Sequence, residues 1–192
     1  MNLEKLKDFV TEKLENELSD KLTYHGVHHT LGVLEICKQY VSRMNISDND
    51  ARLLYTAALM HDTGFIRTYD NHEDESIVYA KEILPNWNYS ELEINKITGM
   101  IRATKIPQKP LTVLEQIMGD SDLDYLGTDL FYSIGETLFN ELMAFNKISS
   151  REQWDSIQLN FLQKHKYHTP FAKEYREPIK QKFIKEISKK LR

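Results

Sequence analysis

Apolar side chains recur every three or four residues along most of the chain, the spacing that places them on one face of an α-helix. Between residues 3 and 18, for example, Leu3, Leu6, Leu14 and Leu18 are separated by Glu and Lys residues, as expected of an amphipathic helix. The same spacing predicts further helices over about 27–44, from Ser47 to Met60, over 72–84, from Ser90 through Ile101, around Leu114–Met118, over 128–145, from Ser150 through Leu162 and over 171–192. No run shows convincing period-two alternation, so the sequence predicts an all-α fold, a helical bundle.

Capping residues and prolines mark several of the predicted helix ends. Ser90 followed by Glu93 fits a capping box, in which each side chain accepts a hydrogen bond from the other residue's backbone N–H. Pro85 ends the fourth helix because proline lacks the N–H that helix continuation needs, and Pro178 predicts a start or kink in the last helix.

The composition agrees with this pattern. Seven Gly and five Pro among 192 residues suit long helices joined by short connections. The shares of hydrophobic and charged residues, 41% and 28%, are ordinary for a globular protein. The length fits one domain, so we expect a single domain over residues 1–192.

The charge of the chain bears on its partners. The formal net charge is −4, and the basic residues are spread along the sequence rather than gathered in a stripe. A groove for nucleic acid or a surface for acidic membranes would need such a stripe. We therefore expect a small-molecule partner, no nucleic acid and no membrane, while a homodimer stays open.

The single cysteine and the N-terminal segment indicate the compartment. Cys37 lies in the apolar run 33–37, which predicts a buried thiol, and no intrachain disulfide can form. The N-terminal segment is interrupted by charge every few residues and lacks the apolar core of a signal peptide. The expected location is cytoplasmic.

Histidine and aspartate residues fall near the ends of several predicted helices. His61 and Asp62 are adjacent, and neighbours on a helix point about 100° apart, so both reach one ion only where the helix ends. Gly64 supplies such an ending. Two imidazoles and two carboxylates would form a nitrogen and oxygen shell suited to a divalent Mn, Mg, Co, Ni, Zn or Fe ion.

Three segments together resemble the ordered H…HD…D signature of the HD superfamily of metal-dependent phosphohydrolases. They are Tyr24–Val33, Ala58–Gly64 and Gly119–Leu123, and the resemblance covers about residues 22–127. It implies an HD-domain helical bundle, with about 128–192 as a C-terminal helical extension. By position, it implies that His29, His61, Asp62 and Asp122 ligate the metal. His28, Asp120 and Asp124 are neighbouring alternatives that fit the family spacing less well.

His72 and Glu73 resemble a His-Glu pair that follows the HD motif in some branches of the superfamily. There the extra His contributes to a second metal, so His72 is a candidate for a second site. The alternative is an exposed residue at a helix N-terminus. Two-metal members supply another His around residues 97–104, and this sequence has none there. One firmly held metal is therefore favoured.

The resemblance implies hydrolysis of a phosphomonoester or phosphodiester, often of a nucleotide, by water that the metal activates. Asp62 or Glu73 would accept the proton. Arg67, Arg102 and Lys105 are the cations placed to hold phosphate oxygens, or else solvated surface residues.

Two other functions stay open at this point. A di-iron oxygenase on the same scaffold would need ligands beyond these four, and a non-catalytic metal-binding regulatory domain would keep them without turnover. The segment 164–170 either folds over the metal cleft or packs as the last connection, and packing is favoured.

Overall fold

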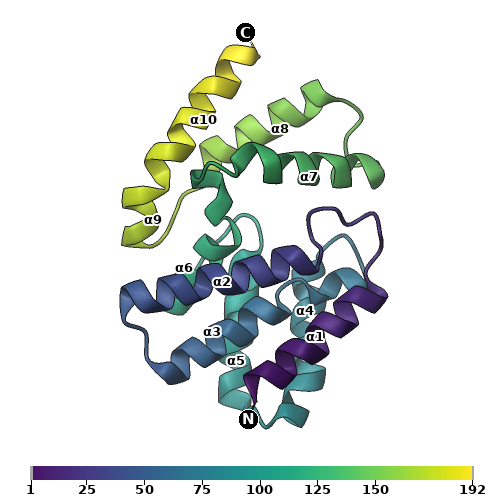
Figure 1. Ribbon diagram of the computed structural model, residues 1–192, viewed down its shortest axis with the longest axis vertical. Helices are drawn as coiled ribbons and strands as arrows, with labels where there is room; N and C mark the ends of the chain where they lie inside the picture. The colour runs from purple at the N-terminus through teal and green to yellow at the C-terminus, as the bar shows by residue number, and fades with distance from the viewer. Residues whose placement is uncertain (1, 192) are drawn as a thin grey trace. The chain divides into compact units, whose positions relative to one another are not determined.

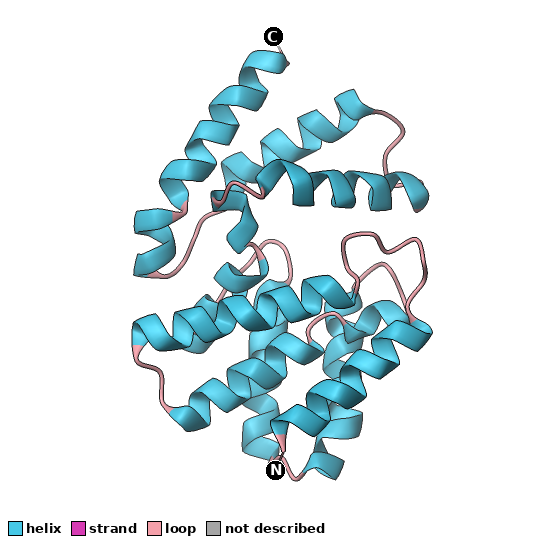
Figure 2. Ribbon diagram, in the orientation of Figure 1, coloured by secondary structure: helices cyan, strands magenta, loops and turns pink. Residues whose placement is uncertain are grey.

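The regular structure is helical throughout residues 2–191, the part of the chain that the computed structural model describes, and no strand occurs there (Figure 2). The α-helices are α1 (Leu3–Glu17), α2 (Val27–Met44), α3 (Asp48–Met60), α4 (His72–Ile83), α5 (Glu91–Thr104), α6 (Val113–Asp122), α7 (Phe131–Ala144), α8 (Arg151–Lys164), α9 (Pro170–Tyr175) and α10 (Glu177–Lys190). Three short 3₁₀ helices join them: η1 (Thr63–Ile66), η2 (Leu84–Trp87) and η3 (Asp124–Gly127). The all-α prediction is confirmed.

Side-chain caps fix several helix starts where the sequence predicts them. The hydroxyls of Ser47, Ser90 and Ser150 accept hydrogen bonds from backbone N–H groups in the first turns of α3, α5 and α8. The capping box of Ser90 and Glu93 is present in both directions. Each cap satisfies a backbone donor that the helix itself leaves without a partner.

One predicted helix begins later than expected, and the break predicted near Pro178 is present. α7 begins at Phe131 rather than Thr128, because residues 124–127 form η3 and Thr128 is extended, with φ −134° and ψ 167°. The last helix is divided into α9 and α10 at Arg176, two residues before Pro178. Proline lacks the N–H for a continuous helix and disfavours helical geometry in the residue before it.

The chain divides into two compact units. The N-terminal unit contains the residues up to Ser19 and His25–Asp122, and the C-terminal unit contains Asp20–Tyr24 and the residues from Leu123 onward. Within the N-terminal unit α3 packs against α2, α5 and α1, and α5 packs against α4 and α6 (Figure 1). Because α3 is covered on so many sides, eight of its thirteen residues are buried.

The C-terminal unit has its own buried contacts. α10 packs on α8, α9 and η3, and Phe131 stacks on Phe183 with ring centroids 4.3 Å apart. Lys180 is fully buried, donates to the backbone carbonyl of His165 at 2.6 Å and pairs with Glu177. Tyr167 donates to the carbonyl of Leu123 at 3.2 Å. Segment 164–170 thus packs inside this unit.

None of the described helices is both long and apolar enough to cross a bilayer.

Candidate metal centre

The four predicted ligands lie together in the N-terminal unit, each at the end of a helix. His29 is in the first turn of α2, His61 and Asp62 directly follow α3, and Asp122 is the last residue of α6. The close packing of α2, α3 and α6 brings these ends to one place. Side chains at helix ends are well suited to a shared site because the chain can turn there.

The candidate ligand atoms converge on one another. His61 Nε2 lies 3.3 Å from His29 Nε2, 3.2 Å from Asp62 Oδ2 and 3.5 Å from Asp122 Oδ1. His29 Nε2 lies 3.1 Å from Asp122 Oδ1 and 3.4 Å from Asp62 Oδ2. His29, His61 and Asp122 each offer one ligand atom, and these three atoms lie within 4.8 Å of one another. A single ion could contact all of these atoms.

The imidazole of His61 is held in one orientation by a backbone carbonyl. Its Nδ1 lies 2.8 Å from the oxygen of Ala58, which can only accept, so Nδ1 carries the proton. In the neutral ring the lone pair is then on Nε2, which faces His29 and the two carboxylates. Metal-binding histidines are usually oriented by such a hydrogen bond at the other ring nitrogen.

Asp62 presents a buried oxygen that lacks a hydrogen bond. The helix has ended by this residue, whose φ of −107° and ψ of 5° leave the α-helical range. The residue is 3% exposed, and its Oδ2 accepts no hydrogen bond from any described residue. A buried carboxylate oxygen without a donor is costly, and a cation among these ligands would remove that cost. The residues present therefore fit a divalent metal ion.

The electrostatics of the cluster favour ionised carboxylates. Burial would lower the pKa of His61, but the charges of Asp62 and Asp122 outweigh it and raise that pKa well above its usual value. Burial would likewise raise the pKa of Asp62 and Asp122, but His61 and the neighbouring histidines hold both well below their usual range. The cluster thus offers two negative charges that a proton or a metal ion can balance.

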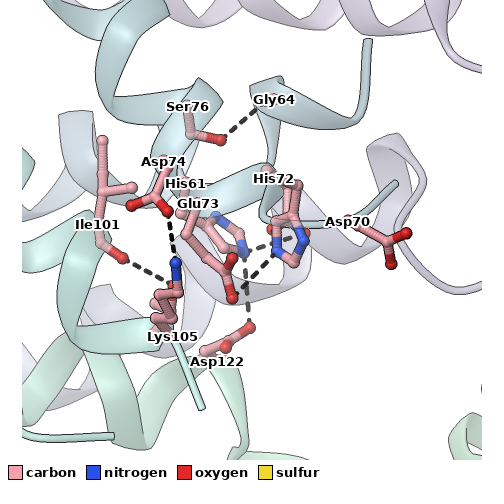
Figure 3. Close-up of polar contacts among 12 residues, drawn as sticks. His61, Gly64, Asp70, His72, Glu73, Asp74, Ser76, Ile101, Lys105 and Asp122 are labelled. Atoms are coloured by element: carbon pink, nitrogen blue, oxygen red, sulfur yellow. Dashed lines mark hydrogen bonds and ion pairs between the residues drawn. The ribbon is translucent and has the colours of Figure 1, made fainter. Parts of the chain in front are cut away.

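Gly64 allows η1 to approach the start of α4. Its N–H donates to Ser76 Oγ at 2.8 Å (Figure 3), and a Cβ at this position would lie 1.9 Å from the carbonyl oxygen of His72. No other residue type fits this approach without moving backbone. The turn after the HD pair therefore fixes the first turn of α4 beside the ligands.

This first turn brings His72 and Glu73 to the cluster. His72 Nε2 lies 3.5 Å from Asp62 Oδ1 and 3.8 Å from Glu73 Oε1. The side chain of His72 is only 18% exposed and stacks on Phe65. His72 is therefore not an exposed residue at a helix N-terminus, which was the alternative that the sequence left open. Burial lowers its pKa. Burial thus favours the neutral form of the His72 imidazole that faces Asp62.

His25 is a neighbour of the site that sequence reasoning did not single out. Its ring centroid lies 5.8 Å from that of His29 and 5.6 Å from that of His72, and it stacks on Phe65 at 4.3 Å. The signal in the sequence is its four-residue spacing from His29. That spacing predicts a shared face only within a helix, and His25 precedes the helix that carries His29.

The three predicted phosphate-binding cations are placed differently. Lys105 lies beside the first turn of α4, with Nζ 2.5 Å from Asp74 Oδ2 (Figure 3). Arg102 is exposed and lines a cavity with Lys105. The guanidinium of Arg67, directly after η1, instead pairs with two carboxylates of α4, those of Glu82 at 2.6 Å and Glu75 at 3.5 Å.

The neighbouring alternatives are not part of the ligand group. Asp124 accepts from Arg176 Nε at 2.8 Å in the C-terminal unit, and Asp120 is fully buried in α6. Among residues 2–191, the atoms that converge come from His29 and Asp122 and not from His28, Asp120 or Asp124.

The family of the chain follows from a comparison with known families. The sequence model of the HD domain matches residues 26–123, slightly more than half of the chain, and this range contains all four predicted ligands. The chain belongs to the HD domain family. The resemblance predicted from the three sequence segments is therefore confirmed.

Two individual proteins are similar to this HD protein. An uncharacterized protein of Clostridium beijerinckii is 34% identical over 84 residues, which are 42% of this chain and 53% of that protein. The chain thus spans about half the length of this curated relative. The crystal structure of a predicted HD superfamily hydrolase from an uncultured Thermotogales bacterium has 23% identity and a TM-score of 0.56, over 85% of this chain and 96% of that one. At that identity the likeness shows a shared fold.

Proposed function

We propose that the protein is a metal-dependent phosphohydrolase that cleaves a phosphomonoester or phosphodiester of a nucleotide-like small molecule. The observation that carries this proposal is the convergence of two imidazoles and two carboxylates, of which Asp62 is buried and its Oδ2 lacks any hydrogen-bond donor among the described residues. Membership in the HD domain family supports it. The preference for nucleotides rests on the family resemblance of the sequence.

His29, His61, Asp62 and Asp122 would hold the ion. Their nitrogen and oxygen donors, without a thiolate, suit Mn, Mg, Co, Ni, Zn or Fe. When bound, such an ion supplies Lewis acidity towards a phosphoryl oxygen and makes water more acidic. The ionised state of Asp62 and Asp122 fits this role, because carboxylates bind metal only when deprotonated.

Glu73 is the better of the two candidate proton acceptors. Asp62 already faces three imidazoles within 3.5 Å and would be occupied as a ligand. Glu73 is 9% exposed, and its carboxylate lies next to His72 at the edge of the cluster (Figure 3). A carboxylate in this position can take a proton from attacking water while the four ligands stay in place.

Lys105 and Arg102 would both hold phosphate oxygens of the substrate. Lys105 lies beside Glu73 and Asp74 (Figure 3), and its pair with Asp74 is exposed, so the ammonium can exchange this partner for a substrate phosphate. Arg67 is a weaker candidate because α4 already engages its guanidinium. The phosphorylated substrate is thus expected to lie between the ligands and the end of α5.

The di-iron oxygenase alternative has one feature in its favour. His72 Nε2 is 3.5 Å from Asp62 Oδ1 and 3.8 Å from Glu73 Oε1, so these three residues could contribute to a second metal ion. The number of ions bound and the product formed separate the two enzymes. A regulatory domain would bind the ion and release no phosphate.

A turnover screen tests the proposal. Metal-stripped protein is given Mn, Co, Ni, Mg or Fe, and phosphate release is measured from nucleotide mono-, di- and cyclic phosphates. We expect release with at least one metal, and Glu73→Gln should keep the bound metal while losing activity. Two irons per chain and no phosphate release would instead favour the oxygenase, and one ion without turnover would favour the regulatory domain.

A further inference from the structure

A cavity lies in the N-terminal unit at the C-terminal end of α5. It has a volume of about 310 Å³ and is formed by α5, the connection 105–112 and the first turn of α6. Small-molecule sites in proteins begin at about this volume, roughly 300 Å³. The cavity can therefore hold a small ligand or one part of a larger one.

The charges around the cavity are mostly positive. Arg102, Lys105 and Lys109 line it together with a single acid, Glu115. The carboxylate of Glu115 already accepts a hydrogen bond from the Leu111 N–H at 2.6 Å. Among the described residues, the side chains of Arg102 and Lys109 enter no ion pair, so their charges are not balanced by the protein. An anion is the complementary ligand.

The remaining walls are apolar. Ile106 and Leu111 belong to the lining and are 51% and 87% exposed. Exposed apolar side chains beside unpaired cations give an anionic molecule an uncharged surface on which its carbon skeleton can rest. The lining is thus suited to an organic anion better than to an inorganic ion alone.

Lys105 reaches from this cavity to the first turn of α4, which carries His72 and Glu73. It lines the cavity, and its ammonium pairs with Asp74, the residue that follows Glu73 (Figure 3). A molecule could therefore have one end at the metal ligands and the other in the cavity, with Lys105 contacting it between them.

We propose that the cavity binds a second phosphate of the substrate, separate from the phosphate that is hydrolysed. This inference rests on the proposed function and narrows its substrate class to small molecules with two phosphate groups at different positions. Arg102 and Lys109 bind the remote phosphate, and Ile106 and Leu111 contact the part of the molecule between the two.

Binding of inorganic phosphate to metal-stripped protein tests the cavity without any need for turnover. Without metal the ligand cluster carries negative charge and repels phosphate, so binding reports on the cavity. Amide NMR signals of Ala103, Ile106 and Leu111 should shift on titration. Lys109→Glu should weaken binding by about tenfold, the usual effect of losing one charge-assisted contact.

Lys96→Glu is the matched control, because Lys96 is an exposed lysine of α5 that does not line the cavity and lies 3.5 Å from Asp50. Lys96→Glu should have a phosphate affinity within about twofold of that of the unchanged protein. Lys109→Arg keeps the positive charge and should also bind phosphate as the unchanged protein does. The inference is overturned if the cavity amides do not shift or if Lys96→Glu weakens binding as much as Lys109→Glu.

A second comparison tests the link to the metal centre. Calorimetry on metal-loaded protein should give adenosine bisphosphate, with phosphates on both the 3′ and 5′ oxygens, about tenfold higher affinity than AMP. Lys109→Gln should remove this difference and leave the affinity for AMP unchanged. Equal affinities in the unchanged protein contradict the second phosphate site, while failure of all phosphate release contradicts only the proposed function.

Discussion

His61 illustrates how a single side chain is prepared for metal binding. The family resemblance implies that it is a ligand, and Gly64 indicates the helix end at which it can share an ion with Asp62. The sequence does not predict the contact of Nδ1 with the Ala58 carbonyl at 2.8 Å, because that depends on the geometry of the last helical turn. His25 was missed for a similar reason: it reaches the site through the fold of the 20–26 segment and through stacking on Phe65.

Asp122→Asn should lose the metal, because an amide cannot supply the negative charge that this position gives the ion. We expect at least about a tenfold loss of affinity, measured by equilibrium dialysis with elemental analysis. Asp124→Asn is the matched control: Asp124 pairs with Arg176 in the C-terminal unit, so this variant should lose stability and keep its metal. Metal loss in Asp124→Asn alone would show that the ligand was assigned to the wrong aspartate.

Cys37 should be unreactive in the folded protein. Its side chain is fully buried, and burial raises the pKa of the thiol to about 12. The thiolate is the reactive form, so alkylation by iodoacetamide at about pH 8 should be negligible until urea unfolds the chain. Mass spectrometry detects the adduct, and rapid labelling of the native protein would contradict the observed packing of α2.

At the scale of helices, the starts marked by capping serines were predictable and the ends set by tertiary contacts were not. Ser90 and Glu93 act on their own helix, so the local sequence contains all the information. The late start of α7 depends on η3, which packs against α10 from a distant part of the chain. The position of Arg67 likewise depends on how η1 packs against α4, which determines that Glu82 and Glu75 engage it.

Gly64→Ala should be strongly destabilising. A Cβ would lie 1.9 Å from the carbonyl oxygen of His72, so the backbone of η1 or α4 must move. We expect a loss of about 3 kcal/mol or more in the free energy of unfolding, measured by urea denaturation, together with weaker metal binding.

Gly32→Ala serves as the control for this glycine. Gly32 is exposed in α2, and nothing lies within 4 Å of a Cβ built there. Alanine should stabilise the helix by about 0.5–1 kcal/mol. Equal effects of the two substitutions would mean that the close approach at Gly64 does not constrain the chain.

Glu93 should contribute to a pH dependence of stability. Hydrogen bonds from the Ser90 N–H, from Arg52 and from the Ser90 hydroxyl lower the pKa of Glu93 from 4.5 to about 2. A lowered carboxyl pKa stabilises the fold above the unfolded value, and this contribution is lost as the pH falls from 4.5 towards 2.

Glu93→Gln should therefore have a lower urea midpoint than the unchanged protein near neutral pH, and the difference should shrink as the solution is acidified. Glu91→Gln, in the same first turn of α5, is the control and should change little. If the difference in urea midpoint between Glu93→Gln and the unchanged protein stays constant from neutral pH to about pH 2, the lowered pKa of Glu93 is contradicted.

At the scale of the whole molecule, the candidate site combines positions that are far apart in the sequence. Residues 29, 61 and 122 meet because α2, α3 and α6 pack together, and helical periodicity alone could not predict which ends meet. The family resemblance supplied that information, and the family match over 26–123 covers every predicted ligand. The C-terminal unit from Leu123 onward lies almost entirely outside this match, so its helices were predictable from their periodicity but its packing was not.

The metal content of the purified protein tests the central claim most directly. Elemental analysis after desalting should find about one divalent ion per chain, and His61→Ala, shown to be folded by circular dichroism, should contain none because it has lost one of four ligands. A metal-free protein that takes up no divalent ion on titration, or a His61→Ala variant that binds as much as the unchanged protein, would contradict the assignment of this cluster as a metal centre.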